Sequence, residues 1–232
     1  MSIILDHKTH IYKLSSGLSL GNSVSKLVNN HWPSFDAATA ARKCGRAARL
    51  KWTGDPDASD DTVMAAWSEN GREAAKKGTD LHERIEKYLL GEECHGLDSV
   101  ISGWLSARFK DWVLEPEKKI AGAVLPEGRL IPGTIDLLAR DPSGNYWIFD
   151  WKRGSVDDSR GDEDVVTGLV GTKLNRYSLQ LSFYATILEN NYDIIVPVER
   201  RRLVKVLEDE TPIEIDPRDL DPMVSVVAAL EI

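Results

Sequence analysis

Alternation of apolar and polar residues is clearest between residues 132 and 153. Within this stretch, apolar-rich runs at residues 134–139 and 146–151 flank a short polar segment, residues 141–145. That segment contains Pro, Gly and Asn, which supply the backbone angles of a tight turn. The pattern therefore predicts a β-hairpin.

A hairpin that is symmetric about Ser143 places Asp136 directly across from Asp150. Lys152 then lies on the same face, because side chains alternate along a strand. The opposite face carries an apolar set that suits packing on a core: Ile135, Leu137, Ala139, Trp147, Phe149 and Trp151.

Two carboxylates that face each other on a sheet repel, so the pair Asp136 and Asp150 calls for a positive partner. A divalent metal ion with oxygen ligands would be such a partner. The alternative is an exposed hairpin whose polar residues face water. The register is also open at this point, because a slip of one residue sends the two aspartates to opposite faces.

Helical periodicity and short strand-like runs account for most of the remaining chain. The predicted helices span residues 36–51, 62–75, 80–90, 100–113 and 175–190. Strands are predicted at residues 118–124 and 194–207, followed by a strand fragment and a last helix within residues 211–232.

The helix at residues 80–90 has a capping-box pattern, because Asp80 is followed by Glu83. His82 and Glu86 fall one turn apart on an otherwise apolar stripe. Such a pair suits metal binding. The commoner interpretation of His82 taken alone is a half-buried, hydrogen-bonded histidine.

Two further segments have both a structural and a functional interpretation. Gln180 and Tyr184 lie one turn apart in the helix at residues 175–190, where Tyr184 would either line a site or bury its ring in a core. Near the N-terminus, Asn22 or Ser23 suits the cap of a helix, and the hydroxyls and amides there also suit a phosphate.

Composition narrows the class of protein. The 232 residues are 28% charged and 42% hydrophobic, which is typical of a soluble globular chain. The formal net charge of −8 argues against a general nucleic-acid coat. It leaves room for a local basic groove, and basic clusters at residues 42–51, 76–77 and 200–205 suit either a groove or a solvated face.

Location and redox chemistry are also constrained. The chain has no apolar run of transmembrane length and no signal-peptide pattern, so we expect a cytoplasmic protein without membrane partners. A nuclear protein, or an organellar one after processing, is the alternative. Cys44 and Cys94 fit no zinc or redox spacing. Two cysteines also exclude an iron–sulfur cluster held by four thiolates of this chain.

Four short motifs follow one another in the order Gly-x-x-x-His, Gly-x-x-Asp, Asp-x-Lys and Gln-x-x-x-Tyr, at residues 78–82, 133–136, 150–152 and 180–184. This ordered set resembles the RecB-type branch of the PD-(D/E)xK nuclease superfamily. Within that branch, the chain is similar to the mitochondrial genome-maintenance exonuclease and related phage exonucleases. These share an Asp-Trp-Lys core and a Ser-Val-Thr-like turn, which here reads Ser23-Val24-Ser25.

The resemblance implies an α/β fold, with a restriction-endonuclease-like core in which helices flank a mixed central sheet. Residues 61–232 would form that core, and residues 1–60 would form a helical region contributing to the DNA groove, within one structural domain. Mg²⁺ or Mn²⁺ would be the cofactor, without an iron–sulfur cluster.

Site roles follow from the same resemblance. Asp136 and Asp150 would be the principal metal ligands, with His82 and the backbone carbonyl of Trp151 completing the set. Lys152 would orient or activate the attacking water, and a neighbouring dication would lower its pKa. Glu86 is a possible additional acid. Contacts to DNA would come from Gln180, Tyr184, Ser23, Ser25 and Arg153.

The implied function is a metal-dependent DNA exonuclease that favours single-stranded or frayed ends, in replication, recombination or repair. The implied source is a phage or a bacterium. Two alternatives stay open at this point: a structure-selective endonuclease, and a non-catalytic nucleic-acid-binding subunit on a nuclease scaffold. The acidic, glycine-containing segment at residues 154–172 is expected to be a mobile loop that gates the site or sets specificity.

Overall fold

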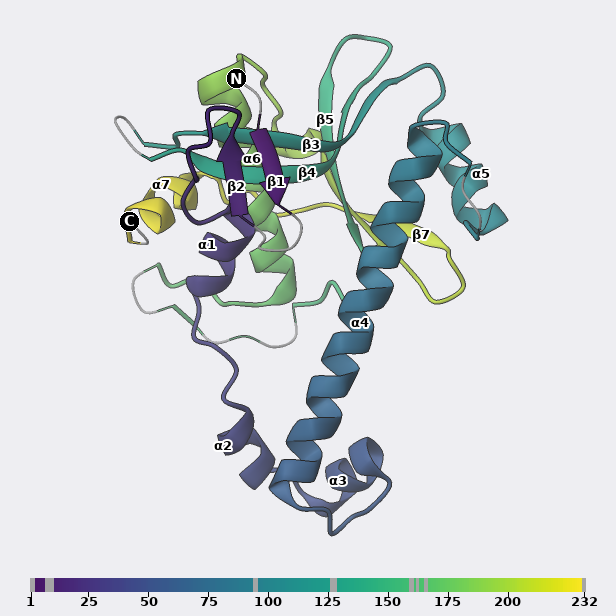
Figure 1. Cartoon of the computed structure of the whole chain (residues 1–232), viewed down its shortest axis with the longest axis vertical. Coiled ribbons are helices and arrows are strands. Elements are labelled where there is room, and N and C mark those ends of the chain that lie inside the picture. The colour runs from purple at the N-terminus through teal and green to yellow at the C-terminus, as the bar shows by residue number, and fades with distance from the viewer. Residues whose placement is uncertain are drawn as a thin grey trace. The chain divides into compact units, whose positions relative to one another are not determined.

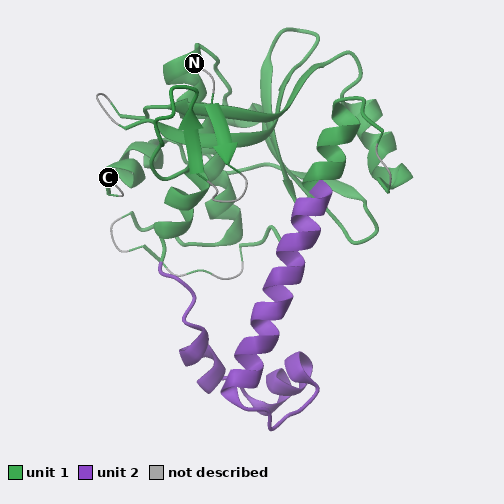
Figure 2. Ribbon diagram, viewed as in Figure 1, with its two compact units in different colours: residues 1–32, 82–232 green, residues 33–81 purple. Residues whose placement is uncertain are grey.

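The chain forms two compact units, residues 1–32 with 82–232, and residues 33–81 (Figure 2). The computed structural model describes residues 3–6, 11–93, 96–125, 129–158, 161, 163–164 and 167–230. Cys94 and part of the segment 154–172 lie outside the described residues.

The larger unit is built on a five-stranded mixed sheet (Figure 1). Its strands lie in chain order, and β5 and β6 form the parallel pair while the other neighbours are antiparallel. The strands are β3 (Val113–Gly122), β4 (Ile131–Arg140), β5 (Tyr146–Lys152), β6 (Arg201–Val206) and β7 (Pro212–Ile215). The predicted α/β class, with a mixed sheet flanked by helices, is confirmed.

Three helices share the main apolar core with this sheet: α1 (Val24–Asn30), α6 (Lys173–Tyr192) and α7 (Asp221–Leu230). A fourth helix, α5 (Ser99–Arg108), contacts β5 through the edge-to-face pair Trp104 and Trp151. A small hairpin of β1 (Ile3–Asp6) and β2 (Ile11–Leu14) precedes them, and a short 3-10 helix, η1 (Val198–Arg200), leads into β6.

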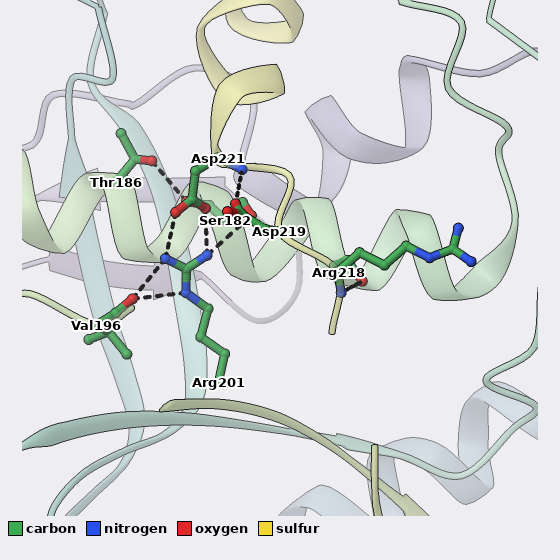
Figure 3. A network of polar contacts seen from close by, with 8 residues as sticks. Ser182, Thr186, Val196, Arg201, Arg218, Asp219 and Asp221 are labelled. Carbon is green, nitrogen blue, oxygen red and sulfur yellow. Dashed lines mark hydrogen bonds and ion pairs between the residues drawn. The ribbon is translucent and has the colours of Figure 1, made fainter. Parts of the chain in front are cut away.

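A buried guanidinium ties β6 to the helices around it (Figure 3). Arg201 is 3% exposed, and it donates to the Val196 carbonyl and to both carboxylate oxygens of Asp221 at the start of α7. It also donates to Ser182 Oγ on α6, at 3.3 Å. Bidentate pairing satisfies the buried charge. Arg201 is therefore a structural member of the basic cluster at 200–205, not part of a solvated face.

The longest helix corrects one sequence expectation. Instead of two helices at 62–75 and 80–90, a single 30-residue helix, α4 (Asp60–Leu89), runs through Gly78. Asp80 therefore does not begin a helix, and the predicted capping box is wrong. An interior glycine costs a helix about 1 kcal/mol, which weakens it without ending it. The cap at the true start is Ser59, whose hydroxyl accepts from the Thr62 amide at 3.2 Å.

Two other predicted helices have different bounds. The single helix expected at 36–51 is two short ones, α2 (Ala37–Arg42) and α3 (Arg46–Thr53), because Gly45 adopts an extended conformation between them. The helix expected at 100–113 ends earlier, and Asp111, with a φ of 64°, turns the chain into β3.

Residues 68–77 of α4 are all exposed, and so are Thr79 and Asp80 after the half-buried Gly78. A polar helical span of this kind depends on intrinsic propensity more than on packing. None of the helices in the described part of the chain combines the length and the apolar character that a membrane crossing requires.

Candidate active site

The β4–β5 hairpin has the register that the sequence predicts. Leu137 pairs with Phe149, and the same offset continues through the next pairs toward the turn. One step further from the turn, this register brings Asp136 level with Asp150. The predicted apolar set is buried except for Trp147, which is partly exposed. The expected symmetry about Ser143 is thereby confirmed.

The turn itself holds this register through one carboxylate. Asp141 accepts hydrogen bonds from the backbone amides of Ser143 and Asn145, each at 2.9 Å, and from Trp147 Nε1 at 3.0 Å. Gly144 supplies the positive φ of 86° that the turn needs. These donors, with Trp147 first, lower the pKa of Asp141 to about 2.

Asp150 lies at the centre of a buried polar chain. It is 2% exposed, and Lys152 Nζ lies 2.6 Å from its Oδ2. Although this is an ion pair, no hydrogen bond of acceptable geometry reaches Oδ2. Gln180 Nε2 lies within hydrogen-bonding distance of Asp150 Oδ1, at 3.3 Å, and of the Tyr184 hydroxyl, at 3.0 Å. The Lys152 ammonium also lies 4.4 Å from the centroid of the Tyr177 ring.

Burial and charge shift the pKa values of this pair. Burial raises the pKa of Asp150 to about 6, with a further contribution from Asp136 and an opposing one from Lys152. For Lys152, burial lowers the pKa, but the charges of Asp150 and Asp136 outweigh it and the net shift is upward. The lowering predicted from the sequence would therefore have to come from the charge of a bound cation.

A second group of polar side chains lies beside the pair of Asp150 and Lys152. Ligand atoms of His82 on α4, Glu117 on β3 and Asp136 on β4 all lie within 4.8 Å of one another. His82 Nδ1 is 3.5 Å from Asp136 Oδ2, which also accepts from the Trp151 amide at 2.8 Å. His82 Nε2 lies 2.9 Å from the Trp151 carbonyl.

The Trp151 carbonyl determines which ring nitrogen of His82 carries a hydrogen. Because a carbonyl oxygen only accepts, Nε2 of His82 must carry the hydrogen of this bond. In the neutral imidazole, Nδ1 is then left with a lone pair directed toward the acidic group. A ring nitrogen that donates to a backbone carbonyl is the usual support of a metal-binding histidine.

Glu117 is a site residue that the sequence did not reveal. In β3 it lies between Pro116 and Lys118, which pair with the two neighbours of Asp136 on β4. The backbone φ of Glu117 is 47°. Burial, followed by the charge of Asp136, raises the pKa of Glu117 to about 7, with His82 opposing and Glu86 adding to the rise. The strand prediction at 118–124 began one residue too late to include it, although β3 starts at Val113.

These residues fit a divalent cation. Carboxylate oxygens and an imidazole nitrogen are donors that Mg²⁺ and Mn²⁺ accept, with the nitrogen favouring Mn²⁺. Burial is the main cause of the raised pKa values of Asp150 and Glu117, and the charge of Asp136 adds to both. The carboxylate of Asp150, whose Oδ2 is paired with Lys152, offers further oxygen donors beside this group.

The N-terminal turn reaches the same region. Ser23 caps α1, accepting from the Lys26 amide at 3.4 Å. A hydrogen bond from Ser25 helps to lower the pKa of Tyr184, although burial leaves that pKa well above its ordinary value. The ring of Tyr184 fits against Gly133, where an added Cβ would come within 2.6 Å of it. Of the two serines, Ser25 is thus the one that joins Tyr184.

Arg153 does not join this group. Its guanidinium donates to Glu210 Oε1 at 2.6 Å, and Arg84 lies 3.5 Å from the same oxygen. Glu86, the possible additional acid, lies near enough to Glu117 for its charge to raise the pKa of that carboxyl.

Tyr12 is a second residue that local sequence patterns did not indicate. Its hydroxyl shares a 2.9 Å hydrogen bond with Thr134 Oγ1. Burial raises the pKa of Tyr12, and the charges of Glu117 and Asp136 raise it further. The β1–β2 hairpin therefore brings a phenol beside the carboxylates.

Parts of the acidic segment 154–172 are anchored. Asp158 accepts from Thr172 Oγ1 at 2.8 Å and pairs with Arg218. Trp32 Nε1 donates to the Leu169 carbonyl at 3.1 Å. These contacts join two parts of the segment to each other and connect it to Trp32, which follows α1, and to Arg218, which precedes α7.

Comparison with known proteins identifies one family. The model of the PD-(D/E)XK nuclease superfamily matches residues 14–225. No curated protein sequence matches the chain. Among solved structures, SSO0001 is 15% identical with a TM-score of 0.39, covering 90% of this chain and 82% of its own. A candidate exonuclease from Eubacterium rectale is 14% identical with a TM-score of 0.32, covering 88% and 72%.

Proposed function

Because this chain belongs to the PD-(D/E)XK nuclease superfamily, we propose that it is a metal-dependent DNA exonuclease favouring single-stranded or frayed ends. The observation that carries the proposal is the buried Asp150, paired with Lys152 and lying beside Asp136. Placing two carboxylates together in a poorly solvated site costs stability, and such groups are typical of binding or catalytic sites.

We assign metal binding to His82, Glu117, Asp136 and Asp150. Bound Mg²⁺ or Mn²⁺ would act as a Lewis acid on the phosphate and on the attacking water. The Trp151 carbonyl, which accepts the hydrogen of His82 Nε2, has a second lone pair for the ligand role that the family resemblance implies.

The remaining residues bind, orient and balance charge. Lys152 would hold the water in line with the scissile phosphorus and balance charge that develops on the phosphate oxygens. Hydrolysis adds this water across the phosphodiester bond, forming one phosphorus–oxygen bond and breaking another. Gln180, whose amide reaches both Asp150 and Tyr184, would align the strand being cut.

The DNA contacts proposed for Ser23, Ser25 and Arg153 differ in what supports them. The contact between Ser25 and Tyr184 supports a role for Ser25. The Ser23 hydroxyl would have to combine capping with phosphate binding. Arg153 would reach DNA only by leaving Glu210.

The finer classification is also a proposal. The ordered motifs support the RecB-type branch and a relation to the mitochondrial genome-maintenance exonuclease and phage exonucleases. We accordingly propose a role in replication, recombination or repair in the cytoplasm of a bacterium or a phage-infected cell. The helical region, predicted as residues 1–60, would contribute to the DNA groove.

A metal series on end-labelled linear single strands, duplexes and circular single strands tests this function, with Asp150→Asn as the control. We expect Mg²⁺- or Mn²⁺-dependent loss of linear strands, intact circles and no cleavage by the variant. Cleavage of circles would favour a structure-selective endonuclease. Absence of any metal-dependent cleavage by the wild type would favour a binding subunit.

A further inference from the structure

The helical unit, residues 33–81, leaves two of its three aromatic residues exposed, while Trp67 is partly buried against its apolar cluster. Its small apolar cluster buries Ala41, Ala58 and Val63. Phe35 is 72% exposed and Trp52 is 39% exposed. Burial of a large aromatic side chain stabilises a fold far more than burial of alanine, so this distribution is not explained by the stability of the unit.

The three aromatic rings of this unit form one continuous patch. Trp67 on α4 contacts both of the others edge to face, with ring centroids 5.7 Å from Phe35 and 6.4 Å from Trp52. Phe35 precedes α2, and Trp52 belongs to α3. We call Phe35, Trp52 and Trp67 the aromatic patch.

The segment that carries Phe35 and Trp52 is basic, in contrast to the chain as a whole. Residues 33–54 contain one acidic residue, Asp36, and five basic ones, while the whole chain has a net charge of −8. The five are Arg42, Lys43, Arg46, Arg49 and Lys51.

Two of these basic residues form ion pairs with aspartates, and the other three do not. Arg46 pairs with Asp57, and Arg49 with Asp60. Arg42, Lys43 and Lys51 are exposed and have no ion pair within the described part of the chain. The ammonium of Lys51 lies 5.8 Å from the centroid of the Trp52 ring.

We propose that the aromatic patch, with Lys51 and the basic end of α2, binds single-stranded DNA by stacking on its bases. Aromatic rings beside positive charge are the combination that binds unpaired strands, since rings take the exposed base faces and cations take the phosphates. A duplex hides its base faces. The choice of DNA as the partner rests on the proposed nuclease function.

Fluorescence anisotropy with a labelled oligothymidylate and a chelator measures binding without hydrolysis. Trp52→Ala and Phe35→Ala should each weaken binding roughly 5- to 100-fold, as expected for loss of one stacked base. Leu50→Ala is the matched control, because Leu50 lies in the same helix and is 51% exposed. It should bind like the wild type.

An abasic strand of the same length gives a test that needs no destabilising substitution. The wild type should prefer the strand with bases, and Trp52→Ala should lose most of that preference. Lys51→Gln should reduce the slope of log affinity against log salt by about one. Equal binding of both strands by the wild type, or wild-type binding by Trp52→Ala, would overturn the proposal.

Failure of this inference and failure of the proposed function give different results. A chain that cleaves linear strands with metal but binds abasic and normal strands equally has the nuclease function without the stacking patch. A chain that binds strands through the patch and cleaves none with either metal retains the patch and loses the nuclease assignment.

Discussion

The two units of this protein depart from ordinary packing in opposite ways. The sheet-containing unit buries the carboxylate of Asp150, which is 2% exposed. The helical unit leaves Phe35 and Trp52 exposed. Buried charge and exposed aromatic surface are both unfavourable, so each marks a place where binding or chemistry outweighs stability.

The units also differ in what holds them together. Large apolar side chains fill the sheet-containing unit, whereas one guanidinium connects the segments of the helical unit. Arg49 donates to the carbonyls of Cys44 (2.9 Å), Ala41 (2.9 Å) and Ala58 (2.5 Å), and to Asp60 at 2.6 Å. The following substitutions test whether this division of roles is correct.

The largest effect is expected from Lys152→Ala. If Lys152 serves the attacking water, turnover should fall about 10²- to 10⁴-fold while DNA binding persists. Steady-state hydrolysis and anisotropy would be measured together. Lys205→Ala is the control, because Lys205 lies beside Lys152 in the parallel register of β6. Undiminished turnover in Lys152→Ala would remove that lysine from the mechanism.

Arg49→Ala should affect the helical unit alone. The substitution removes charged hydrogen bonds and leaves their carbonyl acceptors without a donor. We therefore expect the local free energy of unfolding to fall by about 1.5–3 kcal/mol. Hydrogen exchange would show increased opening at residues 33–81 with little change in β4 and β5. Arg46→Ala should cost about 0–1 kcal/mol, because its ion pair with Asp57 is exposed. Equal exchange in both variants would contradict the role given to Arg49.

Gly133→Ala tests the close packing of the sheet-containing unit. The added Cβ would meet the Tyr184 ring at 2.6 Å, so we expect a loss of roughly 1–3 kcal/mol in the free energy of unfolding. Gly103→Ala in α5 has free space around it and should instead stabilise by roughly 0.5–1 kcal/mol. Thermal or urea unfolding of both variants measures the contrast, and a neutral Gly133→Ala would show that Tyr184 is loosely held.

The smallest effect is expected from Glu117→Gln. Loss of this carboxylate should weaken Mn²⁺ binding roughly 10-fold or more, as measured by calorimetry. The matched control is Glu115→Gln, because Glu115 lies two residues away on β3 and pairs with Lys118. If the two variants bind Mn²⁺ equally well, Glu117 is not a ligand.

Local signals account for what the sequence predicted well. The turn at residues 141–145 contains its own hydrogen-bond donors and acceptor, so the register of the hairpin follows from neighbouring residues. The helix at 175–190 was likewise recognisable from periodicity, and α6 extends it by a few residues at either end. Local signals misled at Gly78 and Asp80, where the sequence suggested the end of one helix and the start of another. The free-energy cost of an interior glycine is small, so the long helix α4 continues through both residues.

The sequence by itself determined the α/β class, the hairpin with its two aspartates, and the ordered motifs of a nuclease family. Only the tertiary structure brought Glu117 and Tyr12 to the carboxylates and set the Trp151 carbonyl against His82. It also revealed that Arg201 is buried and that the aromatic patch is exposed. The physical reason is that hydrogen bonds within a turn depend on adjacent residues, whereas burial and the meeting of distant strands depend on how the whole chain packs.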